Sequence, residues 1–196
     1  MSIISVRIGV FGGCFNPPHI GHLIGAEFVR EEFKLDKVIF IPCYDPPHRD
    51  SPCVSPKTRF YMTKLAIKDN PYFEVLDIEI ARGGKSYTID TIKELMKLYP
   101  DSEIFLIIGC DQAEKFDTWH RYRELLELCR CIILRRKPCN ETHVRKIFGK
   151  NIPIISLDIN VSSNEIRERV RTHRSIKYLV PEAVQEFIQR EKLYLD

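Results

Sequence analysis

The segment 6–33, VRIGVFGGCFNPPHIGHLIGAEFVREEF, passes from an apolar, β-branched run through two glycines and two prolines into an amphipathic stretch. One helical face of that stretch is apolar and is formed by Leu23, Ala26, Val29 and Phe33. This order predicts a strand, a tight Gly/Pro turn and then a helix over 21–34. Two histidines, His19 and His22, stand where the turn becomes the helix.

The rest of the chain repeats this alternation of strand and helix. Short apolar runs, each a candidate strand, cover 6–11, 37–42, 73–80, 103–109, 131–136 and 152–159. Apolar helical faces are expected from Phe60, Met62, Leu65 and Ala66 in 55–69, and from Ile89, Ile92, Leu95 and Met96 in 88–98. The first, second, fourth and fifth runs are almost continuously apolar, which is typical of parallel strands buried on both faces. We therefore predict an α/β fold with a Rossmann-like, doubly wound, mainly parallel sheet and helices on both faces.

The last part of the chain is expected to be helical. In 161–174, Ser162 is followed three positions later by Glu165, which is the spacing of a capping box. In 180–193, Pro181 stands at a plausible first helical position. Because the chain contains no repeat, low-complexity tract or long linker, we predict one domain over 1–196.

Composition excludes several functional classes. With 30 basic and 27 acidic residues the net charge is only +3, so we expect no nucleic-acid partner. No apolar run approaches the roughly 18 residues of a membrane span, and the N-terminal run is too short for a signal peptide. The seven cysteines form no CxxC pair, and those in apolar runs such as EIFLIIGC and CIILRR are expected to be buried and reduced. We expect a cytoplasmic protein without a membrane partner.

The turn after the first strand is suited to binding phosphate. Gly12 and Gly13 allow a ligand to approach the backbone closely, and the helix that follows presents N–H groups and a positive dipole end. His19 and His22 share one face of that helix and both can donate hydrogen bonds. The competing interpretations are capping or surface histidines and a zinc pair. The zinc pair lacks a third and fourth ligand at usable spacing, and the G-x-G-x-x-G and G-x-x-x-x-G-K-[ST] patterns are absent.

These residues carry a resemblance to a known superfamily. GVFGGCFNPPHIGHL resembles the first signature of the nucleotidylyltransferases, whose HxGH element is His19 to His22 here. VSSNEIR, Val161 to Arg167, resembles their second signature, ISSTxIR. The resemblance implies that 1–196 is a single nucleotidylyltransferase domain.

Further segments narrow the resemblance over nearly the whole chain. PPHR, SYTIDTI, IIGCD and DTWHRY are similar to segments of the bacterial nicotinate mononucleotide adenylyltransferases. That family transfers AMP from ATP to nicotinate mononucleotide, giving nicotinic acid adenine dinucleotide and pyrophosphate in NAD biosynthesis. Alternatives are a nicotinamide-preferring or dual-specificity enzyme, a phosphopantetheine adenylyltransferase, and a nucleotide sensor without turnover.

The resemblance assigns roles to particular residues. His19, His22 and Arg167 are implied as catalytic, because they would hold the ATP phosphates. The implied ATP site comprises Gly12, Gly13, Cys14, Phe15, His19, His22, Gly109, Asp111, Ser162, Ser163, Asn164 and Arg167. The implied mononucleotide site comprises Asn16, Arg49, Tyr87, Thr88, Thr91, Trp119 and Arg136. Capping for Asp111, core packing for Trp119 and a solvated loop for Arg49 are the competing roles. For Arg135 and Arg136, a basic surface turn competes with phosphate contact.

Three positions depart from the family pattern. Cys14 replaces the usual Thr, Asn164 replaces the Thr of ISSTxIR, and Asn16 replaces the usual Asp and resembles nicotinamide mononucleotide enzymes. A thiol beside a helix N-terminus, as expected for Cys14, is prone to oxidation. Mg²⁺ is expected to arrive bound to ATP, with no protein ligand and no dedicated metal site. ATP and nicotinate mononucleotide are the implied partners, and the sequence is compatible with a homo-oligomer.

Overall fold

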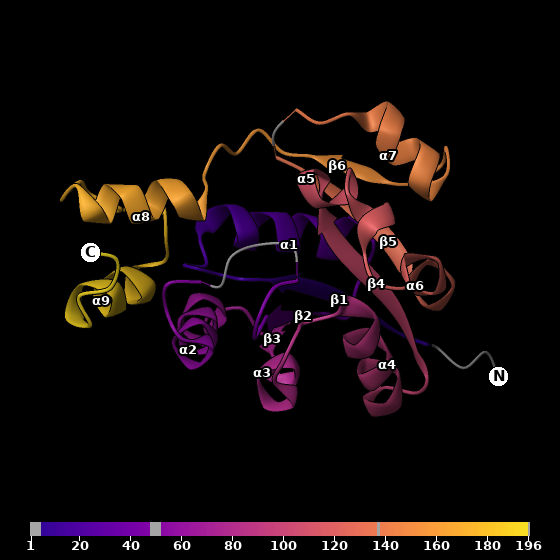
Figure 1. Cartoon of the computed structure of the whole chain (residues 1–196), viewed down its shortest axis with the longest axis horizontal. Coiled ribbons are helices and arrows are strands. Elements are labelled where there is room, and N and C mark those ends of the chain that lie inside the picture. Colours follow the sequence, from indigo (N-terminus) through magenta and orange to yellow (C-terminus); the bar gives the residue numbers. More distant parts are fainter. Residues whose placement is uncertain (1–4, 48–51, 137, 196) are drawn as a thin grey trace.

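A single sheet of six parallel strands organises the chain, of which the computed structural model describes residues 5–47, 52–136 and 138–195. The strand order is β3-β2-β1-β4-β5-β6, the order of a doubly wound fold, which reverses direction between β1 and β4 (Figure 1). The strands are β1 Val6–Gly13, β2 Lys37–Pro42, β3 Phe73–Val75, β4 Ser102–Gly109, β5 Arg130–Arg135 and β6 Ile154–Ser156. The predicted fold class is confirmed.

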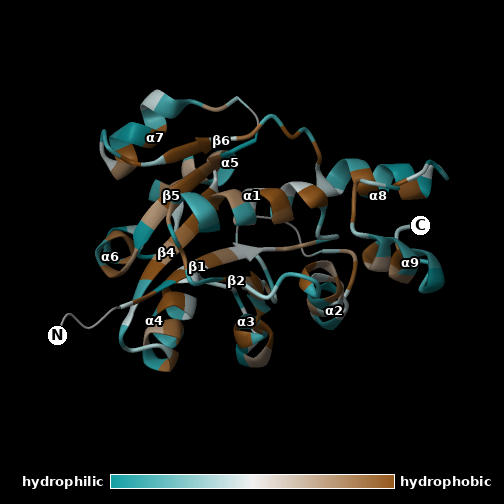
Figure 2. Ribbon diagram, turned by 180° about the vertical axis from the view of Figure 1, so that it is seen from behind, coloured by the Kyte–Doolittle hydropathy of each residue, from teal (hydrophilic) through white to brown (hydrophobic). Residues whose placement is uncertain are grey.

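Helices cover both faces of this sheet. The described helices are α1 Ile20–Glu32, α2 Pro56–Ile67, α3 Ile78–Arg82, α4 Thr88–Leu98, α5 Cys110–Ala113, α6 Tyr122–Leu128, α7 Glu141–Phe148, α8 Ser163–Arg171 and α9 Glu182–Arg190, with a 3₁₀ turn, η1, at Phe116–Thr118. Ala26 and Val29 of α1 pack on one face of the sheet, whereas Ile89, Ile92 and Leu95 of α4 pack on the other. The central strands are hydrophobic (brown in Figure 2), and their side chains contribute to the apolar clusters on both faces of the sheet. Their continuous apolar runs therefore reflect burial on both sides.

Two predicted strands are shorter than their sequence patterns. The run 73–80 forms a strand only over Phe73–Val75, because its ladder to β2 ends at the pair Phe40–Val75 and α3 follows. Ile78 and Glu79 are both buried, but they belong to α3 and not to the strand. The run 152–159 pairs with β5 only over Ile154–Ser156, at the other edge of the sheet.

Three helix predictions need correction. The buried face of α2 consists of Arg59, Met62, Thr63 and Ile67, so Phe60, Leu65 and Ala66 are only partly covered. In α4, Met96 is 39% exposed because that side of the helix faces solvent. Pro181 is the N-cap of α9 and Glu182 is the first helical residue, one position later than predicted.

The C-terminal helices form a third apolar cluster beside the sheet. Ile166 of α8 and Val184 and Ile188 of α9 pack with Met62 of α2, at the end of the molecule away from α4 (Figures 1 and 2). Ser162 caps α8 by accepting a hydrogen bond from the Glu165 backbone N–H at 3.2 Å, as the capping spacing predicted. Helix α8 is therefore fixed at both its start and its apolar face.

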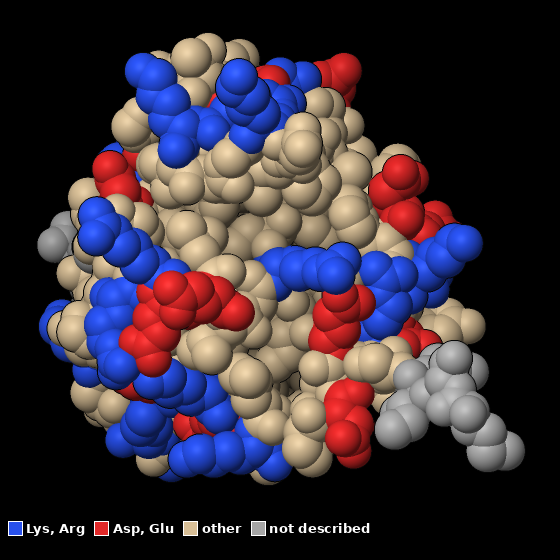
Figure 3. Space-filling view, turned by 90° about the vertical axis from the view of Figure 1, so that its right-hand side faces the viewer, with Lys and Arg blue, Asp and Glu red and all other residues tan. Residues whose placement is uncertain are grey.

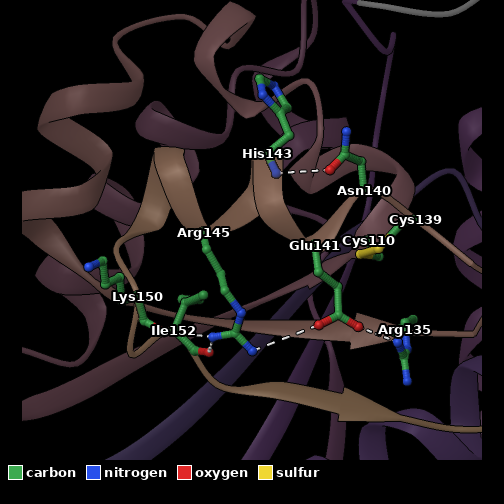
Figure 4. A network of polar contacts seen from close by, with 9 residues as sticks. All are labelled: Cys110, Arg135, Cys139, Asn140, Glu141, His143, Arg145, Lys150 and Ile152. Carbon is green, nitrogen blue, oxygen red and sulfur yellow. Dashed lines mark hydrogen bonds and ion pairs between the residues drawn. A yellow bond between two sulfur atoms is a disulfide. The ribbon is translucent and has the colours of Figure 1, made fainter.

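Cysteine chemistry differs from the expectation in one place. Cys131 is buried and reduced as predicted, whereas Cys110 forms a disulfide with Cys139 (Figure 4). The disulfide joins the start of α5 to the segment before α7. Glu141, the first residue of α7, pairs with Arg135 and Arg145. An apolar run around Cys110 could not reveal this bond, because its partner lies 29 residues further along the chain.

The surface carries both charges interspersed, without a large field of one sign on the face shown in Figure 3. Among the described residues, no helix has the length and apolar character needed to cross a membrane. Acidic and basic side chains are therefore mixed on this face, in keeping with the small net charge of the chain.

A buried arginine ties together the loops that follow β1 and β2. Arg59 on α2 is completely buried, and its guanidinium donates to the carbonyl oxygens of Cys14 at 2.9 Å and Tyr44 at 3.1 Å. Both loops leave the carboxyl ends of neighbouring strands. Arg59 therefore fixes the shape of the loops at this edge of the sheet.

Replacing Arg59 should destabilise the whole domain. We expect Arg59→Met to lower the free energy of unfolding by about 3 kcal/mol, because buried carbonyl oxygens lose their donors. Denaturant unfolding measures this change. Lys64→Met, at an exposed position of the same helix, is the matched control and should change it by less than about 0.5 kcal/mol. Equal effects of the two substitutions would contradict the role given to Arg59.

Candidate active site

A cavity of about 920 Å³ opens at the carboxyl ends of β1 and β4. This is the point where the strand order reverses, the usual ligand position of doubly wound sheets. Its volume suits a nucleotide-sized ligand. Of the residues predicted for the site, those lining the cavity are Gly12, Gly13, Cys14, Phe15, Asn16, His19, His22, Tyr87, Thr88, Gly109, Asp111, Trp119, Arg136, Ser162, Ser163, Asn164 and Arg167. The fold thus brings together segments up to about 150 residues apart in sequence.

The two histidines stack on each other at the start of α1. Their ring centroids are 3.6 Å apart, and Phe15 packs edge-on against His22 at 5.2 Å. His22 Nδ1 accepts a hydrogen bond from the backbone N–H of His19 at 3.2 Å. In a neutral ring this leaves the proton on Nε2, which is then the hydrogen-bond donor.

Both histidines are neutral in this environment. Burial, followed by the positive charge of Arg136, lowers the pKa of His19 to about 3. Burial, His19 and Arg136 together hold the pKa of His22 well below 6.5. Each neutral imidazole keeps one N–H group, which can donate a hydrogen bond to a phosphate oxygen.

Arg136 lies close to His19 in the cavity. The part of the cavity lined by His19, His22 and Arg136 is called the phosphate end here, because its donors suit phosphate oxygens. A Cβ built on Gly21 would lie 3.3 Å from its Nη1 and 3.1 Å from His19 Nδ1, so these atoms crowd the first turn of α1. Arg136 Nη1 and His19 Nδ1 are both buried and have no hydrogen-bond partner among the described residues. An arginine N–H group and an imidazole nitrogen placed in this way are suited to an anionic ligand. Arg135 instead pairs with Glu141.

The start of α8 forms the opposite wall of the phosphate end. Ser163 Oγ donates to the carbonyl oxygen of Pro17 at 2.8 Å, and Arg167 Nη1 donates to that of Asn16 at 2.8 Å. Arg167 Nη2 donates to Asn164 Oδ1 at 2.8 Å. These bonds hold the second sequence motif against the first.

One expected donor of the first motif is already engaged. The backbone N–H of Ile20, the first residue of α1, donates to the carbonyl oxygen of Leu179 at 3.0 Å. The loop ahead of it contains a cis peptide bond between Asn16 and Pro17 and a left-handed Phe15 at φ 46°. The segment before α9 therefore contacts the helix start that carries the histidines.

Aromatic side chains gather at the other end of the cavity. Tyr87 stacks on His120 with ring centroids 4.6 Å apart, and Trp119 packs on Phe116 at 4.9 Å. Trp119 is half-buried, and its Nε1 is a buried donor without a hydrogen-bond partner in the part of the chain that the structure describes. These rings offer stacking faces for a flat heteroaromatic group. His120 joins this wall although the sequence pattern did not single it out.

Thr91 does not line the cavity; it is buried and its hydroxyl donates to Glu79 Oε1 at 2.6 Å. As a β-branched residue on the inner face of α4, it serves packing and this buried bond. Arg49 lies outside the described residues.

Glu79 lines the cavity and was not predicted. Its side chain is buried, which raises its pKa, while hydrogen bonds from Thr91 and Ser86 act in the opposite direction. Ser86 Oγ in turn accepts a hydrogen bond from the backbone N–H of Tyr44 at 2.9 Å. No spacing signal could have found Glu79, because its position depends on α3, which replaced a predicted strand.

Asn16 is held by residues distant in sequence. Tyr194 donates its hydroxyl to Asn16 Oδ1 at 2.7 Å, and Asn16 Nδ2 lies 3.6 Å from the sulfur of Cys53. Asn16 is buried, so its amide is occupied by protein groups. Tyr194 is a second supporting residue that no local pattern could indicate.

Comparison with known proteins agrees with this geometry. The cytidylyltransferase-like family model matches residues 10–169. A "Probable nicotinate-nucleotide adenylyltransferase" of Thermoanaerobacter sp. (strain X514) is 44% identical, over 96% of this chain and 94% of its own. A protein of the same name from Dictyoglomus thermophilum is 43% identical, over 97% of this chain and 100% of its own.

A solved structure matches the fold. Plasmodium falciparum nicotinic acid mononucleotide adenylyltransferase complexed with NaAD has a TM-score of 0.79 at 17% identity, over 96% of this chain and 97% of its own. The family model covers both motifs that frame the phosphate end, and the curated relatives cover nearly the whole chain. The chain therefore belongs to the cytidylyltransferase-like family of nucleotidylyltransferases, together with these nicotinate-nucleotide adenylyltransferases.

Proposed function

We propose that this protein transfers AMP from ATP to nicotinate mononucleotide, giving nicotinic acid adenine dinucleotide and pyrophosphate for NAD biosynthesis. The observation that carries the proposal is the pairing of two donor sets at one end of the cavity. His19, His22 and Arg136 line the cavity around the start of α1, and Ser163, Asn164 and Arg167 line it from the start of α8. Aromatic faces lie at the far end, where a pyridine ring would stack.

The mechanism needs no protein nucleophile. The phosphate of the mononucleotide attacks the α-phosphorus of ATP, the bond to the β,γ-pyrophosphate breaks, and the protein aligns the two and stabilises the developing charge. Neutral His22 donates from Nε2, while Arg136 and Arg167 supply positive charge to the phosphate oxygens. Arg136, assigned to the mononucleotide by resemblance, is thereby reassigned in this proposal to the ATP phosphates.

Magnesium would enter with the nucleotide. Within the described part of the chain, no three His, Cys, Asp or Glu side chains are placed to hold a metal ion. The donors around the phosphate end suit phosphate oxygens, and Mg²⁺ prefers phosphate oxygens and water to a full protein cage. Mg²⁺ bound to ATP would neutralise part of the triphosphate charge.

The proposed reaction takes place in the cytoplasm.

The choice of mononucleotide tests the proposal directly. We expect pyrophosphate release from Mg-ATP to be at least tenfold more efficient, in kcat/KM, with nicotinate mononucleotide than with nicotinamide mononucleotide. Parallel assays of pyrophosphate release measure both rates. Comparable rates would instead support a dual-specificity enzyme, for which Asn16 is the motivating residue. Release with neither substrate would overturn the proposal.

Two substitutions of His22 distinguish the role of Nδ1 as an acceptor from the role of Nε2 as a donor. His22→Asn keeps an acceptor near the Nδ1 position but has no group at the Nε2 position, so kcat should fall about 100-fold or more while the fold survives. His22→Gln places an amide N–H₂ nearer the Nε2 position and should retain more activity. Thermal unfolding checks folding, and His143→Ala, on α7 outside the cavity, is the control. Equal activities of the Asn and Gln variants would refute donation from Nε2.

The neutral histidines also predict how stability depends on pH. The pKa of His19 is about 3 in the folded protein but near 6.5 when unfolded, so the unfolded chain binds more protons at acid pH. Stability is therefore complete above pH 6.5 and falls as pH drops toward 3, by about 2 kcal/mol between pH 6.5 and 5 for this residue. Denaturant unfolding of wild type and His19→Gln at both pH values measures the difference. An identical pH dependence in the two proteins would contradict a buried, neutral His19.

A further inference from the structure

Two cysteine sulfurs meet at the floor of the cavity. Cys14 follows β1 and Cys43 follows β2, and the thiol of Cys43 donates to the sulfur of Cys14 at 3.3 Å. The residues before them, Gly13 and Pro42, are partners in the parallel ladder, and the backbone N–H of Cys43 donates to the carbonyl oxygen of Gly13 at 2.9 Å. The sulfur contact thus continues the register of two neighbouring strands.

This placement is compatible with a disulfide. Adjacent strands lie about 4.8 Å apart, within the range of Cα separations that disulfides span. The sulfurs need to approach by little more than 1 Å to reach the bonded distance of about 2.05 Å. The pair is not bonded in the structure, whereas Cys110 and Cys139 are.

The surroundings favour attack by Cys14 and resolution by Cys43. Both cysteines line the cavity, but Cys14 is half-buried whereas Cys43 is only 6% exposed. Hydrogen bonding to Cys14 and burial raise the pKa of the Cys43 thiol, so Cys43 keeps its proton while donating to its neighbour. The guanidinium of Arg59 lies 3.6 Å from the Cys43 sulfur and binds the Cys14 carbonyl, which adds positive charge beside the pair.

We propose that Cys14 and Cys43 form a dithiol modification site that low-molecular-weight disulfides oxidise through the nucleotide cavity. The Cys14 thiolate attacks one sulfur of the small disulfide, forms a mixed disulfide and releases one thiolate. Cys43 loses its proton and attacks the Cys14 sulfur, which releases the second thiol. The two cysteines together lose two electrons and two protons, and the small disulfide is reduced to two thiols. Adenylyl transfer uses neither sulfur as a nucleophile.

Oxidation should also reach the phosphate end of the cavity. Cys14 is followed directly by Phe15 and Asn16, which pack against His22 and bind Arg167 through the Asn16 carbonyl. Drawing the Cys14 sulfur toward β2 displaces this loop. The resulting loss of activity rests on the proposed function, whereas formation of the bond does not.

The first experiment maps the bond. The native protein is incubated with oxidised glutathione, alkylated, digested and analysed by mass spectrometry for a Cys14–Cys43 cross-link. Cys129 and Cys131 are the internal control: they are also neighbouring buried thiols, but neither lines the cavity. We expect the Cys14–Cys43 cross-link to form first, while Cys129 and Cys131 stay reduced.

Two variants test the order of events. In Cys43→Ser the resolving thiol is gone, so Cys14 should accumulate as a mixed disulfide with glutathione. Cys53→Ser removes a third reduced cysteine that lines the cavity and should leave the Cys14–Cys43 bond unchanged. Pairing of Cys14 with Cys53, a mixed disulfide that persists on wild-type Cys14, or absence of reaction at both cysteines would overturn the proposal. The cross-link map of the wild-type protein tests the proposed bond even if a variant folds poorly.

The activity assay follows the same samples. We expect kcat/KM of the oxidised wild type to fall at least tenfold and to recover after dithiothreitol. The Cys43→Ser variant should form no Cys14–Cys43 cross-link under the same conditions. A mapped bond with unchanged activity would overturn the effect on the phosphate end. Absence of turnover in the reduced protein would count against the proposed function alone, because the map does not depend on turnover.

Discussion

The hydrogen bonds between the start of α8 and the loop after β1 are the contacts on which the cavity depends. Ser163 and Arg167 bind the carbonyl oxygens of Pro17 and Asn16, so the second motif is held against the first across some 150 residues of sequence. Without them the histidine pair and the α8 N-terminus would be two separate anion sites. With them, both line one cavity.

The positive charge of the phosphate end comes from its arginines and not from its histidines. Both imidazoles are neutral through burial, and Arg136 keeps a buried Nη1 without a hydrogen-bond partner among the described residues. Such groups are costly to leave unpaired. Their arrangement is maintained by the surrounding packing of Phe15 and α1, so stability is used to preserve donors in the positions that binding requires.

Much of this molecule could be predicted from its sequence, and the failures have physical causes. The central strands and α1 are local patterns, so their ranges and the first motif were found directly. Glu79 could not be placed, because an edge strand ended early and α3 formed in its place. Thr91 was assigned to the site although it faces inward from α4 and binds Glu79. Arg59 and Tyr194 support the loops through contacts distant in sequence, and an arginine in an amphipathic pattern is normally assigned to the solvent face. The Cys110–Cys139 bond likewise depends on tertiary proximity alone.

The contacts of Leu179 and Tyr194 have a consequence for synthesis of the chain. Both residues follow the last strand of the sheet in sequence and leave the ribosome after it, yet they bind the helix start and the loop that carry the first motif. The strands β1 to β6 can pair earlier, since all their residues precede position 157. A nascent chain can therefore hold its sheet before it has a finished nucleotide cavity, and ligand binding becomes available only when translation has passed Tyr194.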